Sequence, residues 1–86
     1  MQQFTYLIKA DYAIHFGPAG RLAALARQYN DSTAILKMGT RSANISQIMK
    51  VATMGTRKGD VITVTVEGPS EVELADVLYQ YFEDNM

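Results

Sequence analysis

The chain has 86 residues, enough for one domain with a modest hydrophobic core and too few for two. Its formal net charge of −1 gives no bulk attraction for nucleic acid or anionic lipid, so any phosphate recognition must be local. The chain contains no cysteine and one histidine, which excludes disulfides and thiolate chemistry and argues against a metal site.

No apolar run approaches the ~20 residues that a membrane span needs, and the N-terminus lacks the features of a signal peptide. We therefore expect one domain over residues 1–86 that is soluble, cytoplasmic and monomeric. We expect it to bind no nucleic acid, to insert in no membrane, and to hold no metal or other cofactor.

The first half of the chain predicts a strand, a helix and a strand pair. Apolar and polar residues alternate from Phe4 to Ala10, which is typical of a strand with one buried face. Pro18 suits the first turn of a helix, because its missing N–H is not needed there. Gly39 permits a tight turn between short strands at 33–38 and 40–45. The helix extends to residue 29 along an apolar stripe made of Leu22, Leu25, Ala26 and Tyr29.

The second half predicts a short helix, the clearest strand and a terminal helix. The short helix begins at Ser46 or Gln47 and ends before Gly55, with Val51 and Met54 inward and Met49 exposed as a partner contact. The basic loop 56–60 leads into a strand at 61–67. Residues 70–73 match a capping box at the start of a helix whose buried stripe is Ala75, Leu78 and Phe82. The order predicts a two-layer α+β domain with one sheet and all helices on one face.

His15 is the candidate functional residue. It stands just before a Gly-Pro step that opens a helix, where free N–H groups and the helix dipole favour an anion such as phosphate. Imidazole is a competent nucleophile near neutral pH. Arg21 lies one turn into the helix, where its side chain either reaches back to a phosphate on His15 or remains on the polar face. Asp11 either orients His15 or turns back onto its own backbone.

Several segments resemble the HPr family, the histidine-containing phosphocarriers of the bacterial sugar phosphotransferase system. Ala10-Asp11, Ile14-His15, Pro18-Ala19 and the helix to Tyr29 look like that family's active-site region. The string Ile48-Met49-Lys50-Val51-Ala52-Thr53-Met54-Gly55 resembles its second-helix segment, and Lys58-Gly59-Asp60 with the strand that follows resembles its fourth strand. The resemblance covers essentially the whole chain in matching element order.

The resemblance implies an open-faced β-sandwich, with a four-stranded antiparallel sheet and three helices on one side. His15 would accept a phosphoryl group from a phosphoenolpyruvate-dependent kinase and pass it to a sugar-permease component. The protein would then be a stoichiometric carrier and no enzyme. Phe16, Gly17 and Arg21 would surround the phosphate. The implied partner-docking surface comprises Phe16, Gly20, Arg27, Ile48, Met49 and Lys50.

The chain departs from the family pattern at two positions. The family has an arginine two residues after the histidine, where this chain has Gly17, and Arg21 is the candidate replacement. Some members carry a regulatory serine just before Ile-Met. That position holds Gln47 here, and Ser46 lies one residue earlier. Ser46 is the candidate regulatory phosphorylation site, and the shift disfavours its use by a kinase.

Two other functions stay open at this point. A degenerate family member would dock onto regulatory partners with little or no phosphoryl transfer. A small α+β domain that senses a ligand would be unrelated to phosphoryl transfer.

Overall fold

A computed structural model describes residues 1–11 and 14–86. The strands and helices follow the predicted order along the chain. They are β1 (Gln2–Leu7), α1 (Phe16–Arg27), β2 (Thr33–Met38), β3 (Arg41–Asn44), α2 (Ile48–Ala52), β4 (Val61–Glu67) and α3 (Glu71–Asn85).

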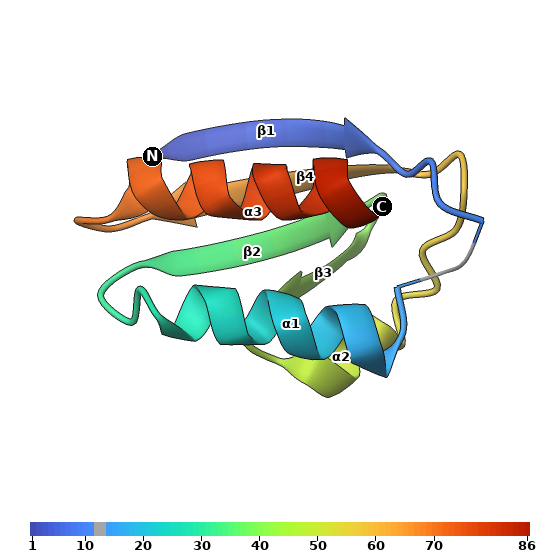
Figure 1. Ribbon diagram of the computed structural model, residues 1–86, viewed down its shortest axis with the longest axis horizontal. Coiled ribbons are helices and arrows are strands. Elements are labelled where there is room, and N and C mark those ends of the chain that lie inside the picture. The colour runs from blue at the N-terminus through green and yellow to red at the C-terminus, as the bar shows by residue number, and fades with distance from the viewer. Residues whose placement is uncertain (12–13) are drawn as a thin grey trace.

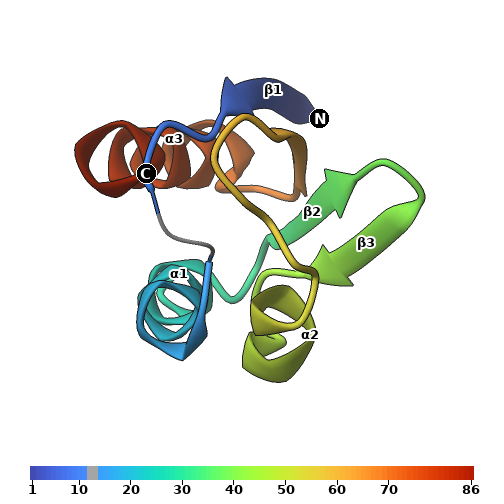
Figure 2. The same ribbon diagram turned by 90° about the vertical axis from the view of Figure 1, so that its right-hand side faces the viewer.

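The four strands form one antiparallel sheet with the order β1-β4-β2-β3 (Figure 1). The three helices lie on the same side of this sheet, with α3 over β1 and β4 and with α1 beside α2 (Figures 1 and 2). The other side of the sheet is open. The predicted α+β fold, an open-faced sandwich with helices on one face, is confirmed.

The core lies between the sheet and the helices, because alternate strand residues point inward. In β4 the inward residues Ile62, Val64 and Val66 are fully buried, whereas Thr63 and Thr65 between them are half-buried. Phe82 of α3 is also fully buried, and its ring stacks on Tyr6 of β1 with centroids 5.5 Å apart. The stripes that predicted α1 and α3 supply the other wall of this core.

β1 is shorter at its C-terminal end than the alternation predicted, because its partner β4 begins only at Val61. Ile8 bonds instead to the loop before β4, donating its N–H to Asp60 O (2.9 Å) and accepting from Gly59 N (2.8 Å). Lys9 and Ala10 donate their N–H groups to the backbone oxygen of Met86, both at 2.6 Å. The chain thus leaves the sheet three residues before the predicted end of the strand.

The predicted capping box at the start of α3 is wrong. Ser70 is the N-cap residue, but its side chain makes no capping hydrogen bond. Its Oγ donates to Asp31 Oδ2 (3.1 Å), and its backbone N–H donates to Ser32 Oγ (2.9 Å). The polar groups at the start of α3 therefore link that helix by hydrogen bonds to the turn before β2.

Gly68 allows the start of α3 to approach this turn closely enough for these hydrogen bonds. Its φ of +134° lies in the region that favours glycine, and a Cβ there would come within 2.6 Å of Ser32 Cα. Gly59 has a φ of +94°, but a Cβ there would meet no atom within 4 Å.

We expect Gly68→Ala to lower the free energy of unfolding by about 2–4 kcal/mol, because steric overlap adds to backbone strain. Gly59→Ala carries only the strain and should lower it by about 1 kcal/mol. Urea unfolding followed by circular dichroism measures both values. Equal losses in the two variants would contradict the close approach of Gly68 to Ser32.

Candidate functional site

His15 is the N-cap residue of α1. Its backbone is extended, with φ −117° and ψ −167°, and its carbonyl accepts the N–H of Ala19 at 2.9 Å. The side chain also caps the helix, because Nδ1 accepts the N–H of Gly17 at 3.2 Å. The helix thus begins at Phe16, with Pro18 in its first turn, and the histidine belongs to the helix terminus itself.

The capping hydrogen bond determines which ring nitrogen carries the lone pair. Because Nδ1 accepts from Gly17 N–H, the proton of the neutral imidazole resides on Nε2. The first turn of α1 contains no acidic residue, and the positive end of the helix dipole lies there. His15 is also solvent-exposed. The site therefore presents a nucleophilic nitrogen at a position that favours an anion.

Gly17 lets the imidazole lie close to the helix. A Cβ at position 17 would lie 3.1 Å from His15 Cε1, closer than most such contacts, and at an ordinary contact distance of 3.5 Å from Nδ1. The imidazole ring thus occupies space that the side chain of a larger residue at position 17 would fill. Gly20, one turn further, has no atom within 4 Å of an added Cβ. The departure from the family arginine therefore changes the space around the histidine as well as the local charge.

Arg21 and Asp11 lie on the exposed surface to either side of His15 in the sequence. The Arg21 guanidinium belongs to α1, so its approach to a phosphate on His15 stays a prediction. Asp11 Oδ1 accepts a hydrogen bond from Lys58 Nζ at 3.0 Å. The sequence had not suggested this partner, because 47 residues separate the two.

The residues expected at the docking surface come from α1 and α2, which pack against each other. Phe16 and Met49 are large apolar side chains with 57% and 65% of their surface exposed. Lys50 is exposed too, whereas Ile48 is half-buried against the core. Val51 and Met54 point inward as predicted. The prominent apolar part of this surface is therefore Phe16 and Met49.

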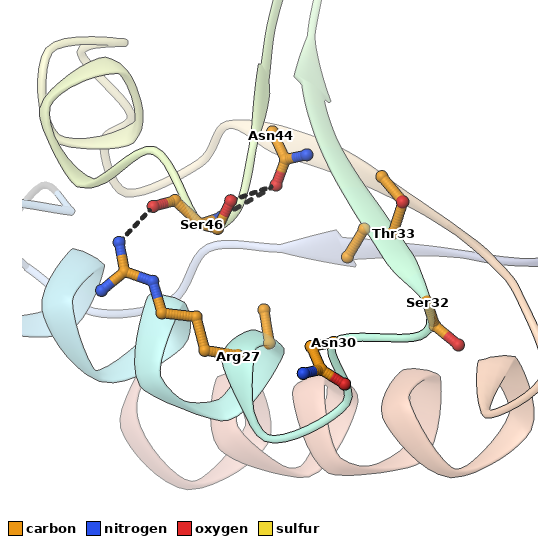
Figure 3. A pocket seen from close by; sticks show the side chains of 8 residues that line it. Arg27, Asn30, Ser32, Thr33, Asn44 and Ser46 are labelled. Carbon is orange, nitrogen blue, oxygen red and sulfur yellow. Dashed lines mark hydrogen bonds between the residues drawn. The ribbon is translucent and has the colours of Figure 1, made fainter.

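Arg27 and Ser46 lie at the opposite end of α1 from His15. The Arg27 guanidinium donates to Ser46 O (2.9 Å), and Ser46 Oγ donates to Asn44 Oδ1 (2.8 Å; Figure 3). The hydroxyl of Ser46 is thus held by a neighbouring side chain, and the residue is half-buried. A polar cavity of about 240 Å³ lies beside them and is lined by Ala26, Arg27, Asn30, Ser32, Thr33, Ala34, Asn44 and Ser46.

No helix in the described part of the chain is both long and apolar enough to cross a bilayer. Within residues 1–11 and 14–86, no three side chains of the metal-binding types come together.

The fold and the site define a small open-faced α+β protein with an exposed histidine at a helix N-terminus. A family model described as the phosphorylation site of the HPr component of the phosphotransferase system (PTS) matches residues 2–84. The chain therefore belongs to the HPr family of phosphocarrier proteins.

Individual relatives agree with this assignment. The phosphocarrier protein HPr of Mycoplasma genitalium is 28% identical over 85 residues, which cover 99% of this chain and 97% of the relative. HPr of Vibrio cholerae is 30% identical over 71 residues, covering 83% and 82%. A crystal structure of HPr from Thermoanaerobacter tengcongensis superposes with a TM-score of 0.89 at 25% identity, covering 98% of this chain and 93% of that one.

Because Gly17 lies against the imidazole and Gly20 does not, we expect alanine substitutions at these two positions to have different effects. Gly17→Ala should displace the His15 ring and weaken its capping bond, changing the ¹⁵N chemical shifts of the ring. Gly20→Ala fills open space, so it should leave those shifts unchanged and raise the free energy of unfolding by about 0.5–1 kcal/mol. NMR spectra and urea unfolding of both variants check this. Ring shifts that stay at wild-type values in Gly17→Ala would show that the imidazole does not lie against Gly17.

Proposed function

We propose that the protein is a phosphocarrier that accepts a phosphoryl group on His15 and passes it to a protein acceptor. One observation carries this proposal: in a chain of the HPr family, the exposed His15 directs Nδ1 to the first free N–H groups of α1. A nucleophile, an anion-favouring helix terminus and access for a large partner thus coincide at one residue.

The hydrogen bond to Gly17 supports Nδ1 as the acceptor atom. Its lone pair attacks the phosphorus of the donor, a P–Nδ1 bond forms, and the bond from phosphorus to its leaving group breaks. The proton on Nε2 can leave to solvent, because the ring is exposed. The N–H of Gly17 no longer bonds to Nδ1 and becomes a donor to a phosphoryl oxygen. One N–H thus serves the free and the phosphorylated states.

The family suggests the partners. The donor would be the phosphoenolpyruvate-dependent first enzyme of the phosphotransferase system, and the acceptor would be a sugar-permease component, with the exchange taking place in the cytoplasm. The protein would act as a stoichiometric carrier and not as an enzyme. Phe16 and Met49 would form the apolar centre of the surface that both partners cover, with Gly20, Arg27, Ile48 and Lys50 around it.

A regulatory docking module with little phosphoryl transfer is the second candidate. Gly17 favours it, since no guanidinium extends from that position to stabilise the charge of a phosphate. The exposed Met49 suits either function, because methionine adapts to several partners.

Phosphorylation by phosphoenolpyruvate and the first enzyme separates the two candidates. We expect an acid-labile phosphoprotein that His15→Ala abolishes, because phosphoramidate bonds hydrolyse in acid and no other histidine is present. Mass spectrometry before and after acid treatment measures it. A protein that takes no phosphoryl group, while it binds partners through Met49 and independently of His15, would establish the docking module instead.

Arg21 is proposed to replace the missing family arginine. A charge-assisted hydrogen bond contributes about 1.5–3 kcal/mol, so we expect Arg21→Ala to slow phosphohistidine formation by roughly ten- to a hundredfold. Rapid-quench measurement of the phosphorylation rate tests this. Lys37→Ala is the matched control, because it removes one positive charge from the exposed surface of β2. If both variants react at the wild-type rate, Arg21 does not assist the transfer.

A further inference from the structure

Thr56 is the buried polar residue of the described part of the chain, with none of its surface exposed. It lies in the loop between α2 and β4 and is 42 residues from the segment it contacts. Its Oγ1 accepts a hydrogen bond from the backbone N–H of Ile14 at 3.1 Å. A buried hydroxyl with a long-range backbone partner fixes two segments relative to each other, because breaking the bond leaves a buried N–H unsatisfied.

We propose that Thr56 is a positioning residue for His15 and acts through the backbone of Ile14. This inference rests on the function proposed above. Ile14 immediately precedes the histidine, and its side chain is 1% exposed and belongs to the core. The Thr56 bond fixes the backbone on the N-terminal side of His15. On the C-terminal side, the bonds from Ala19 N and Gly17 N do the same.

Other contacts between the same two segments are weaker anchors. Lys58 pairs with Asp11 at 3.0 Å, but these side chains are 64% and 88% exposed, so solvent and salt screen the pair. The backbone bonds of Ile8 with Gly59 and Asp60 act seven residues before His15. Among these contacts, only the hydrogen bond of Thr56 is buried and reaches the residue next to the histidine. This bond therefore fixes the position of the backbone from which the His15 ring extends.

Phosphoryl transfer is sensitive to such placement. The reacting atoms must approach in line, and a shift of about 1 Å reduces rates by up to a hundredfold. Thr56 acts on His15 through the backbone N–H of Ile14. Its loss should therefore reduce the rate of transfer and leave the docking surface of Phe16 and Met49 intact.

Thr56→Val keeps the shape of the side chain and removes the acceptor. We expect it to slow phosphoryl transfer from the first enzyme by about tenfold at saturating concentration, with the KM for that enzyme changed less than twofold. Thr56→Ser keeps the hydroxyl and should restore most of the rate. Thr53→Val is the matched control, because the Thr53 hydroxyl bonds locally to Met49 O in α2, and it should react within about twofold of wild type. Circular dichroism confirms that each variant is folded.

NMR provides a readout that needs no phosphoryl transfer. In Thr56→Val the amide of Ile14 should exchange faster with solvent and the His15 ring signals should shift, whereas Thr53→Val should change neither. If the wild-type protein accepts no phosphoryl group, the proposed function fails, and unchanged His15 signals in Thr56→Val would overturn the positioning role as well. If the wild type is phosphorylated, a wild-type rate in Thr56→Val, an effect on KM alone, or a Thr56→Ser variant as slow as Thr56→Val would overturn it.

Discussion

The hydrogen bond from Gly17 N to His15 Nδ1 is the interaction on which the site depends. A helix begins with N–H groups that have no partner within the helix, and here the imidazole supplies one acceptor for them. Because Nδ1 must lie within hydrogen-bonding distance of α1, its lone pair stays at the positive end of the helix dipole. The stabilisation of the helix and the placement of the His15 imidazole thus come from a single contact. The remainder of the fold holds that contact at an exposed position beside α2.

Glycine at position 17 changes how this site works. A larger residue would press against Cε1 of His15, so the close approach of the ring depends on the missing side chain. The protein also lacks a guanidinium two residues after its histidine, and under the proposed function a phosphate there would rely on backbone N–H groups and on Arg21. Under the proposed function, this combination would give a well-capped free state and a less strongly stabilised phosphorylated state. A carrier needs both to hold the group and to release it, so the balance of these two states governs the proposed function.

Much of the fold could be predicted from the sequence, because it is encoded locally. The alternation in residues 61–67 predicted β4, and the apolar stripe through Leu22 and Ala26 predicted α1. The errors arise where distant residues compete for the same polar groups. Ser70 has the sequence of a capping residue, but Asp31, 39 residues away, accepts its hydroxyl. For the site, the spacing of His15 and Pro18 predicted the helix terminus. The contacts of Thr56 with Ile14 and of Lys58 with Asp11 join residues far apart in the chain, and no local sequence pattern indicates them. Both could therefore be identified only from the structure.

The position of the phosphoryl group on the imidazole tests the central claim most directly. The protein labelled with ¹⁵N at its histidine would be phosphorylated with phosphoenolpyruvate and the first enzyme of the phosphotransferase system. The ring would then be observed by ¹⁵N and ³¹P NMR. We predict a bond from phosphorus to Nδ1 of His15, accompanied by a shift of the Gly17 amide signal as its acceptor changes from nitrogen to a phosphoryl oxygen. Phosphorylation at Nε2, or at Nδ1 with an unmoved Gly17 amide, would contradict the account.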